Sequence, residues 1–231
     1  MKRKEPETKP EGESRAYALV LSYLEQQIRK GDLKLGDKLP SERTLMGELG
    51  LGRNSVREGL RQLENMGFIH SAQGQGSFLV NQADRGISGI LSMLLLLDQT
   101  SRAEFFSLRQ SLEQGALDRM VQQEEPEVLC RMEKALSAME ASPDGTGREA
   151  AERVFHWTLI TGGRNHLSET LVHALTELDD AYRQETLARI SEETRRRLLD
   201  AHRAMVQALR EKDREKGRLA LEEHFQLICG T

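Results

Sequence analysis

Four side chains in the C-terminal half of the chain have the residue types and the spacing of a metal site. Glu152 and His156 are four residues apart, so they lie on the same face of a helix. His202 and His224 each lie 11 residues from Asp213, which can cap a helix that follows it. If two helices fold back on each other about Asp213, the two histidines lie at the same height. Should both face inward, they meet the first pair in one cavity, where three imidazoles and one carboxylate suit a divalent metal.

The spacing alone leaves other interpretations open. A histidine on a helix is more often a surface group or a satisfied core group than a ligand. A metal held by histidines can also activate water, with Glu152 as the base, so a metal-dependent hydrolase is an alternative. The sequence contains no nucleophile elbow, phosphate loop or H-E-x-x-H motif. We therefore expect a binding protein and not an enzyme.

A second group of polar side chains opens a predicted helix in the N-terminal third of the chain. Arg53, Asn54, Ser55 and Arg57 follow Gly50-Leu51-Gly52, which separates two short helical patterns. A helix–turn–helix places the start of its second helix in the major groove of DNA. Arginine suits that position because its planar fork pairs with a guanine edge or a phosphate. The alternative is an ordinary solvated helix face.

Two short helices and a hairpin must position these groups. Ser41 is a good N-cap for the first helix, and the helix–turn–helix runs from Ser41 to about Met66. The predicted apolar faces are Leu45, Met46 and Leu49 in the first helix, and Val56, Leu60 and Leu63 in the second. Residues 68–72 and 77–80 then predict two strands, joined by Gln73-Gly74-Gln75-Gly76 as a wing. Gln73 and Gly74 at its tip are candidate DNA contacts, although glycines in a hairpin turn are often only conformational.

The rest of the chain predicts helices without a strand. Ser101 and Glu104 have capping-box spacing, and Pro126 suits the first turn of a helix. Further helices are expected at about 148–161, 167–190, 192–211 and 214–228. The predicted fold is mainly α, with an N-terminal winged helix–turn–helix and a C-terminal all-α bundle of six to seven helices. The expected divisions are a disordered tail at 1–13, a DNA-binding domain at 14–82, a linker at 83–89 and a helical domain at 90–231.

Composition excludes several classes of protein. Aromatic residues make up 4% of the 231 residues, which argues against stacking platforms for single-stranded nucleic acid. The net charge is −4, so any DNA-facing charge has to be local. Cys130 and Cys229 form no paired motif and are expected to be buried thiols in a reducing compartment. The charged N-terminus is no signal peptide, and the run Ile90–Leu97 is too short to span a membrane, so we expect a cytoplasmic protein.

The stretch from Leu39 to Ile69 resembles a known family. The patterns L-P-S-E-R-x-L, L-G-x-x-R-x-S-V-R-x-x-L-x-x-L and G-x-I are similar to the winged helix–turn–helix of GntR-family bacterial transcription factors. Gly52 departs from that family, which usually has Ser or Thr there. The resemblance implies the following contacts with double-stranded DNA: Arg43, Arg53, Asn54, Ser55 and Arg57.

The second half resembles the all-helical FCD effector domain of the FadR-type subfamily. The similarity lies in Phe155-His156 after an acid, in Ala201-His202 and in Glu223-His224. Many members of this subfamily bind zinc or nickel through Asp, His, His and His. The resemblance therefore implies a divalent metal, zinc first with nickel or manganese as alternatives, on Glu152, His156, His202 and His224. Glu152 stands where the family has Asp.

Arg109 lies in the R-x-x-L-E context in which subfamily members have an arginine that can hold an effector carboxylate. Its alternative role is a salt bridge, for instance with Glu113 four residues on. The resemblance implies a homodimeric regulator, most often a repressor, that binds a palindromic operator and responds to a small organic acid. A metal-free regulator of a bulkier ligand such as an acyl-CoA is the alternative.

Overall fold

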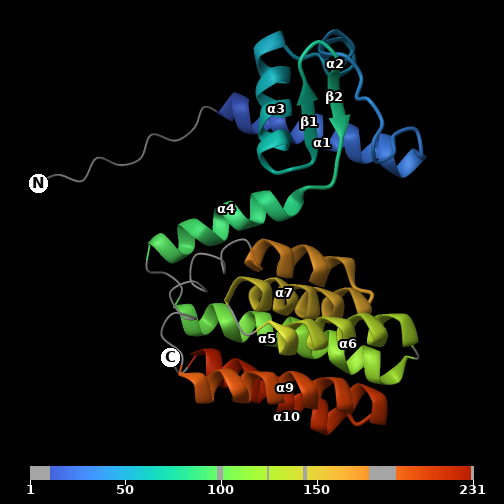
Figure 1. The fold of residues 1–231 in the computed structure, drawn as a ribbon. Helices are drawn as coiled ribbons and strands as arrows, with labels where there is room; N and C mark the ends of the chain where they lie inside the picture. The colour runs from blue at the N-terminus through green and yellow to red at the C-terminus, as the bar shows by residue number, and fades with distance from the viewer. Residues whose placement is uncertain (1–10, 98–100, 124, 143–144, 177–190, 230–231) are drawn as a thin grey trace, which may run out of the picture. The chain divides into compact units, whose positions relative to one another are not determined.

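The computed structural model describes residues 11–97, 101–123, 125–142, 145–176 and 191–229 of the chain. These residues fall into two compact units, Met1–Ile87 and Ser88–Thr231. Both units are mainly helical, and the described residues form one two-stranded sheet, which lies in the first unit (Figure 1). The predicted fold class, a winged helix–turn–helix followed by a helical bundle, is confirmed.

The first unit is a helix–turn–helix with a wing. Its elements are α1 (Glu11–Lys30), α2 (Glu42–Leu49), α3 (Arg53–Asn65), β1 (Ile69–Ala72) and β2 (Gly76–Leu79). Ser41 caps α2 as predicted, since its side chain accepts a hydrogen bond from the backbone N–H of Thr44 at 3.1 Å. Gly50 ends α2 with φ of 63°. The two strands pair antiparallel, with Ile69 opposite Leu79 and Ala72 opposite Gly76.

A small apolar core holds α3 and the wing in place. Val56 and Leu63 of α3 pack with Val20 of α1, Leu45 of α2 and Leu79 of β2, and all five are buried. Val56, Leu60 and Leu63 recur every three or four positions along α3, so they occupy one side of the helix. The opposite side of α3 is therefore left for solvent or for a partner.

Gly67 joins α3 to the wing in a conformation that excludes a side chain. Its φ is +81°, and a Cβ there would lie 2.0 Å from the carbonyl oxygen of Gln82. The Gln82 N–H in turn donates to the Gly67 carbonyl at 2.8 Å. Gly67→Ala is expected to destabilise the first unit by about 2 kcal/mol or more, because it adds backbone strain and a steric clash. Urea unfolding followed by circular dichroism measures this change.

Gly47 provides the matched control for Gly67→Ala. It lies inside α2, and a Cβ there would meet nothing within 4 Å. Gly47→Ala should therefore leave stability unchanged or raise it by up to about 1 kcal/mol, since alanine is the better helix former. Equal effects of the two substitutions would contradict the assignment of strain to Gly67.

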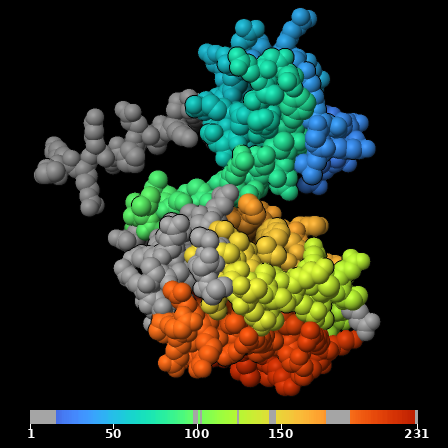
Figure 2. All heavy atoms as spheres, in the orientation of Figure 1, coloured from blue at the N-terminus to red at the C-terminus, as the bar shows by residue number. Residues whose placement is uncertain are grey.

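The second unit is a bundle of helices. It comprises the C-terminal part of α4 (Ala83–Leu96), then α5 (Arg102–Gln122), α6 (Pro126–Ala141), α7 (Gly145–Gly162), a helical segment at 166–176, α9 (Glu192–Glu211) and α10 (Arg214–Cys229). Ser101 and Glu104 form the predicted capping box, and Pro126 is in the first turn of α6. Figure 2 shows α6, α9 and α10 side by side on one face of this unit.

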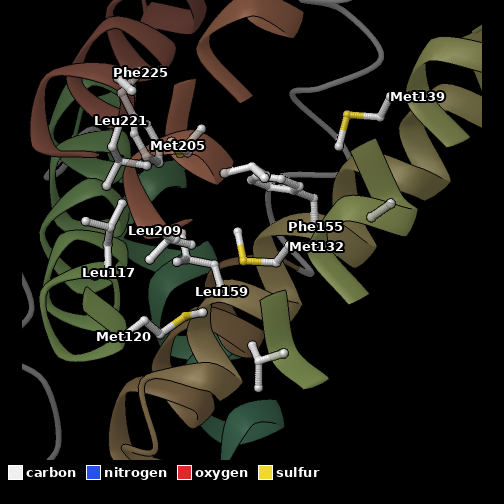
Figure 3. Packing of buried hydrophobic residues seen from close by; sticks show 14 of the residues in the cluster. Leu117, Met120, Met132, Met139, Phe155, Leu159, Met205, Leu209, Leu221 and Phe225 are labelled. Carbon is white, nitrogen blue, oxygen red and sulfur yellow. The ribbon is translucent and has the colours of Figure 1, made fainter. Parts of the chain in front are cut away.

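The core of the second unit draws on all of the labelled helices from α5 to α10. Leu117, Met132, Leu159, Met205 and Leu221 come from five different helices and are fully buried. Figure 3 shows these side chains converging. Because side chains from several helices pack closely in this core, the position of each helix is fixed. Polar side chains on different helices can therefore meet inside the bundle in a defined geometry.

The structure differs from the sequence-based expectations in three places. The expected linker at 83–89 is helical and forms the first half of α4, in which Gly86 packs closely against the backbone of Met66. Residues 11–13 of the expected tail belong to α1, while 1–10 lie outside the described residues. The prediction that Cys130 and Cys229 are buried is wrong, since both are exposed. Of the helix expected at 167–190, residues 177–190 lie outside the described residues.

Candidate metal centre and DNA-binding surface

The chain reversal at Asp213 occurs as predicted. Helix α9 ends at Lys212 in a left-handed conformation, with φ of 54°. Asp213 then caps α10 by accepting from the backbone N–H of Lys216 at 3.0 Å. The two helices pack side by side, in orange and red in Figure 1. This reversal brings His202 of α9 and His224 of α10 to the same level of the bundle.

Glu152 and His156 of α7 complete a cluster with these two histidines. One potential ligand atom from each of Glu152, His156, His202 and His224 lies within 4.8 Å of the others. All four side chains are buried, and the three histidines are at most 2% exposed. The structure thus brings together the four residues named from the sequence, and none of them points to a separate surface.

Hydrogen bonds determine which ring nitrogens face the centre of the cluster. Nδ1 of His202 lies 2.7 Å from the carbonyl oxygen of Leu198, an acceptor, so this nitrogen carries the hydrogen. Nε2 of His202 therefore has the lone pair, and it lies 3.2 Å from Nε2 of His156. The ring centroid of His224 is 4.6 Å from those of His156 and His202. Burial, together with the charge of His156, lowers the pKa of His202 to about 4, so its imidazole is neutral at pH 7.

A buried ion pair lies directly behind His156. Oε2 of Glu113 accepts from Nδ1 of His156 at 2.6 Å, and its Oε1 accepts from Nε of Arg109 at 2.8 Å. Burial alone would raise the pKa of the Glu113 carboxyl, but the interactions and hydrogen bonds with His156 and Arg109 outweigh it and lower this pKa. The alternative role of Arg109, a salt bridge with Glu113, is therefore present in the structure.

The donor set fits a divalent transition metal. Around a tetrahedral zinc ion with bonds of about 2.0–2.2 Å, neighbouring donor atoms lie about 3.3–3.6 Å apart. The 3.2 Å between the two Nε2 atoms is close to that spacing, and the limit of 4.8 Å for the whole cluster is wider. Neutral imidazoles and a carboxylate are the forms that bind metal. The buried Nδ1 of His224 forms no hydrogen bond in the structure, although the ring packs against its neighbours.

A cavity of about 410 Å³ adjoins this cluster. Arg109 and His156 line it, together with Arg153, Trp157 and His173. Its size is at the lower end of the range for small-molecule pockets in proteins. His156 is the one residue of the four-residue cluster that lines this cavity, so the cavity and the cluster share that side chain.

The candidate DNA contacts lie on one helix start, one neighbouring helix and the wing. Arg53, Asn54 and Arg57 of α3 are exposed and Ser55 is half-buried, on a helix whose other side forms the core. Arg43 of α2 is also exposed, as are Gln73 and Gly74 in the turn of the wing. Gly74 has φ of 74°, which glycine adopts without strain. Gly52 offers no side-chain cap to α3, in line with its departure from the family pattern.

Several residues of the site were not singled out by the sequence analysis. Glu113 was considered only as a salt-bridge partner, and Arg153, Trp157 and His173 were not considered as cavity residues. A signal for Glu113 does exist, because it falls on the face of α5 that carries Phe106 and Leu117, both buried. No comparable pattern marks the cavity residues, since their meeting depends on the packing of α7 against the segment at 166–176.

The fold and the two sites define a DNA-binding regulator with an effector domain. Two family models match the chain, one of bacterial regulatory proteins of the gntR family over residues 16–79, the other of the FCD domain over residues 104–227. The chain belongs to the GntR family of bacterial transcriptional regulators and carries an FCD domain. This pair of domains fits the FadR-type subfamily.

Curated relatives are regulators as well. The HTH-type transcriptional regulator LutR of Bacillus subtilis (strain 168) is 31% identical over 185 residues, which cover 80% of this chain and 81% of LutR. The HTH-type transcriptional repressor NanR of Salmonella schwarzengrund is 29% identical over 217 residues, 92% of this chain and 82% of NanR. The solved structure of a Streptococcus agalactiae GntR protein has a TM-score of 0.68 at 21% identity, covers 92% of this chain and 98% of that one, and supports the fold. These matches identify a regulator and not an enzyme.

Among the described residues, no helix combines the length and the apolar character needed to cross a membrane.

Proposed function

We propose that this regulator binds a palindromic operator as a homodimer and acts as a repressor whose operator affinity responds to a small carboxylate metabolite. The metabolite binds in the cavity beside the histidine cluster, where a divalent metal and Arg109 hold it. On double-stranded DNA, the start of α3 enters the major groove, with Arg43 and the wing tip on the flanking backbone. A protein that regulates bacterial promoters in this way works in the cytoplasm.

One observation carries the effector half of this proposal. Four buried residues have potential ligand atoms within 4.8 Å of one another, and one of them, His156, also lines the cavity. Arg109 lines the same cavity. A metal and a guanidinium on one cavity wall favour a ligand with a carboxylate and a second oxygen. The size of this cavity favours a small acid over an acyl-CoA.

Zinc is the proposed metal, with nickel or manganese as alternatives. Three imidazole nitrogens and one carboxylate oxygen form a donor set typical of zinc, and nickel accepts the same ligands. The carboxylate of Glu152 is a harder donor than an imidazole. A metal that is bound by this carboxylate can therefore also be manganese, which favours carboxylate ligands.

Helix α4 is the proposed route between effector and DNA. It begins in the first unit and continues into the second, where Leu91 and Leu95 pack against the core. An effector can change operator affinity only if it binds two states of the protein unequally. We propose that these states differ in how α4 docks on the effector domain.

A panel of small carboxylates tests the proposal. Purified protein is loaded with zinc and melted with acetate, succinate or citrate, with and without a chelator. A ligand that binds the folded protein raises the melting temperature by mass action, and the rise should vanish with the chelator. Trp157 is the only tryptophan of the chain and lines the cavity, so its fluorescence should report binding directly. No response to any acid in the metal-loaded protein would contradict the proposed class of effector.

Arg109→Lys tests the proposed carboxylate contact. Lysine keeps the positive charge beside Glu113 but lacks the planar fork, so the fold should persist while carboxylate affinity falls about tenfold or more. Titration of Trp157 fluorescence with the most stabilising acid measures the change. Arg210→Lys is the matched control, because Arg210 pairs with Glu133 away from the cavity at 2.9 Å. Equal affinities of the two variants would argue against Arg109 as the contact.

A further inference from the structure

Glu113 is a fully buried charge on a face of α5 that also carries Arg109 and several buried apolar residues. Its side chain is 0% exposed, and Phe105, Phe106 and Leu117 on the same helix are buried as well. Removing a carboxylate from water costs several kcal/mol, which an ion pair offsets only when its geometry is good. Replacing both members of a buried ion pair by hydrophobic residues of similar volume is often neutral or stabilising, so the pair of Glu113 and Arg109 is weak evidence for a stabilising role. The position of Glu113 therefore indicates a role other than stability.

The contacts of Glu113 define the tautomer of His156. An ionised carboxylate only accepts hydrogen bonds, so Nδ1 of His156, at 2.6 Å from Oε2, has to carry the hydrogen. Nε2 of His156 is then left with its lone pair, and this atom lies 3.2 Å from Nε2 of His202. Metal-binding histidines commonly donate their second ring N–H to a carboxylate, which orients the ring and makes it a stronger ligand.

The other oxygen of Glu113 restrains the cavity arginine. Oε1 accepts from Nε of Arg109 at 2.8 Å, and this side chain is 5% exposed. The guanidinium also lies 6.0 Å from the ring centroid of Phe225. A planar group held at Nε and placed near an aromatic ring has little rotational freedom, so its orientation at the cavity wall depends on Glu113.

We propose that Glu113 is the positioning residue of the effector site, because its carboxylate orients the metal ligand His156 with one oxygen and the cavity residue Arg109 with the other. This inference rests on the proposed metal site and extends it to a residue that touches neither the metal nor the effector. One buried carboxylate thus sets the relative geometry of the two groups that capture the effector acid.

Glu113→Gln tests this role with little change of volume. The amide has one acceptor and one donor end, so it cannot accept from both His156 and Arg109. If the amide oxygen accepts from His156, its NH₂ group opposes the N–H of Arg109. If the amide turns over, His156 must move its hydrogen to Nε2, which blocks the lone pair that faces His202. Either arrangement breaks the geometry that the carboxylate maintains.

Two measurements on the full-length protein read out the effect. Competition of zinc with a chromophoric chelator should show affinity about 10- to 100-fold weaker in Glu113→Gln than in the wild type. Nitrogen NMR of histidine-labelled, metal-free protein should show the hydrogen of His156 on Nδ1 in the wild type, and a changed His156 signal in the variant. The His156 signal is assigned by its loss in His156→Asn. Circular dichroism checks the fold.

Glu133→Gln is the matched control, because it makes the same chemical change in a Glu–Arg pair, with Arg210, outside the site. Zinc affinity should be unchanged in this variant. Equal zinc affinity in Glu113→Gln and the wild type overturns the positioning role, as does an equal loss in Glu133→Gln. A wild-type His156 with its hydrogen on Nε2 overturns it without any variant. A wild type that binds no zinc overturns the proposed metal site, and the positioning role with it. Failure of the metal site is therefore distinguishable from failure of the positioning role alone.

Discussion

Replacing His202 and His224 together by alanine is expected to abolish metal retention. The two imidazoles provide half of the four donors in the cluster, and Glu152 and His156 alone form a site of two ligands on one helix face. Two ligands hold zinc far more weakly than the three or four of stable protein sites. Elemental analysis of protein purified without chelator measures the loss, and carboxylate-dependent stabilisation should disappear with it.

His70 and His166 allow a matched control for this double variant. Both are exposed and lie outside the cluster, one in β1 and the other beside Glu169. His70→Ala with His166→Ala also removes two imidazoles, and metal content should stay at the wild-type level. Because His202 and His224 are buried, circular dichroism must show that their double variant still folds. Normal metal content in a folded His202→Ala/His224→Ala protein would refute the site.

Arg53→Ala or Arg57→Ala is expected to weaken operator binding by about 1–3 kcal/mol for each arginine that is removed, or about 5- to 150-fold. Both side chains are exposed near the start of α3, the part of a recognition helix that meets DNA. Arg57 pairs with Glu42 at 3.5 Å in the structure. An exposed pair of this kind contributes about 0–1 kcal/mol, so a DNA phosphate or base can displace Glu42. Fluorescence anisotropy with promoter DNA measures the change.

Arg61→Ala is the control on the same helix. Arg61 lies beyond the N-terminal turns of α3 and its side chain is 69% exposed, so its removal should affect binding less. A salt titration then separates the two kinds of interaction: removing an arginine that binds a phosphate reduces the salt slope by about 1, whereas removing one that reads a base relaxes sequence preference. If Arg53→Ala and Arg57→Ala both bind promoter DNA like the wild type, α3 is not the recognition helix.

Local signals in the sequence predicted the DNA-binding unit well. Ser41 caps α2, Gly50 ends it, and the two strands of the wing pair as a hairpin. Each of these features depends on residues within a few positions of one another, so the chain encodes them without long-range information. The apolar stripe of α3 is local in the same sense, and it places Arg53 and Arg57 on the outer side of the helix.

The cluster of Glu152, His156, His202 and His224 was predicted from spacing because helices have a regular rise. Two histidines at equal distances from Asp213 must lie level when the chain reverses there, and two residues four apart must share a face. What spacing did not specify is which faces turn inward, and the resemblance to the FCD domain was needed for that. The structure places all four side chains in the interior.

By itself, the sequence determined the helix caps at Ser41 and Ser101, the hairpin, the family and the four candidate ligands, because each depends on short-range geometry or on a recognisable pattern. Only the tertiary structure decided that α4 runs through the expected linker, that Cys130 and Cys229 are exposed, and that Glu113 joins His156 to Arg109. The physical reason is that burial and hydrogen-bond partners depend on what the rest of the chain packs against each residue. His156 is 43 residues from Glu113 in the sequence and 2.6 Å from it in the fold.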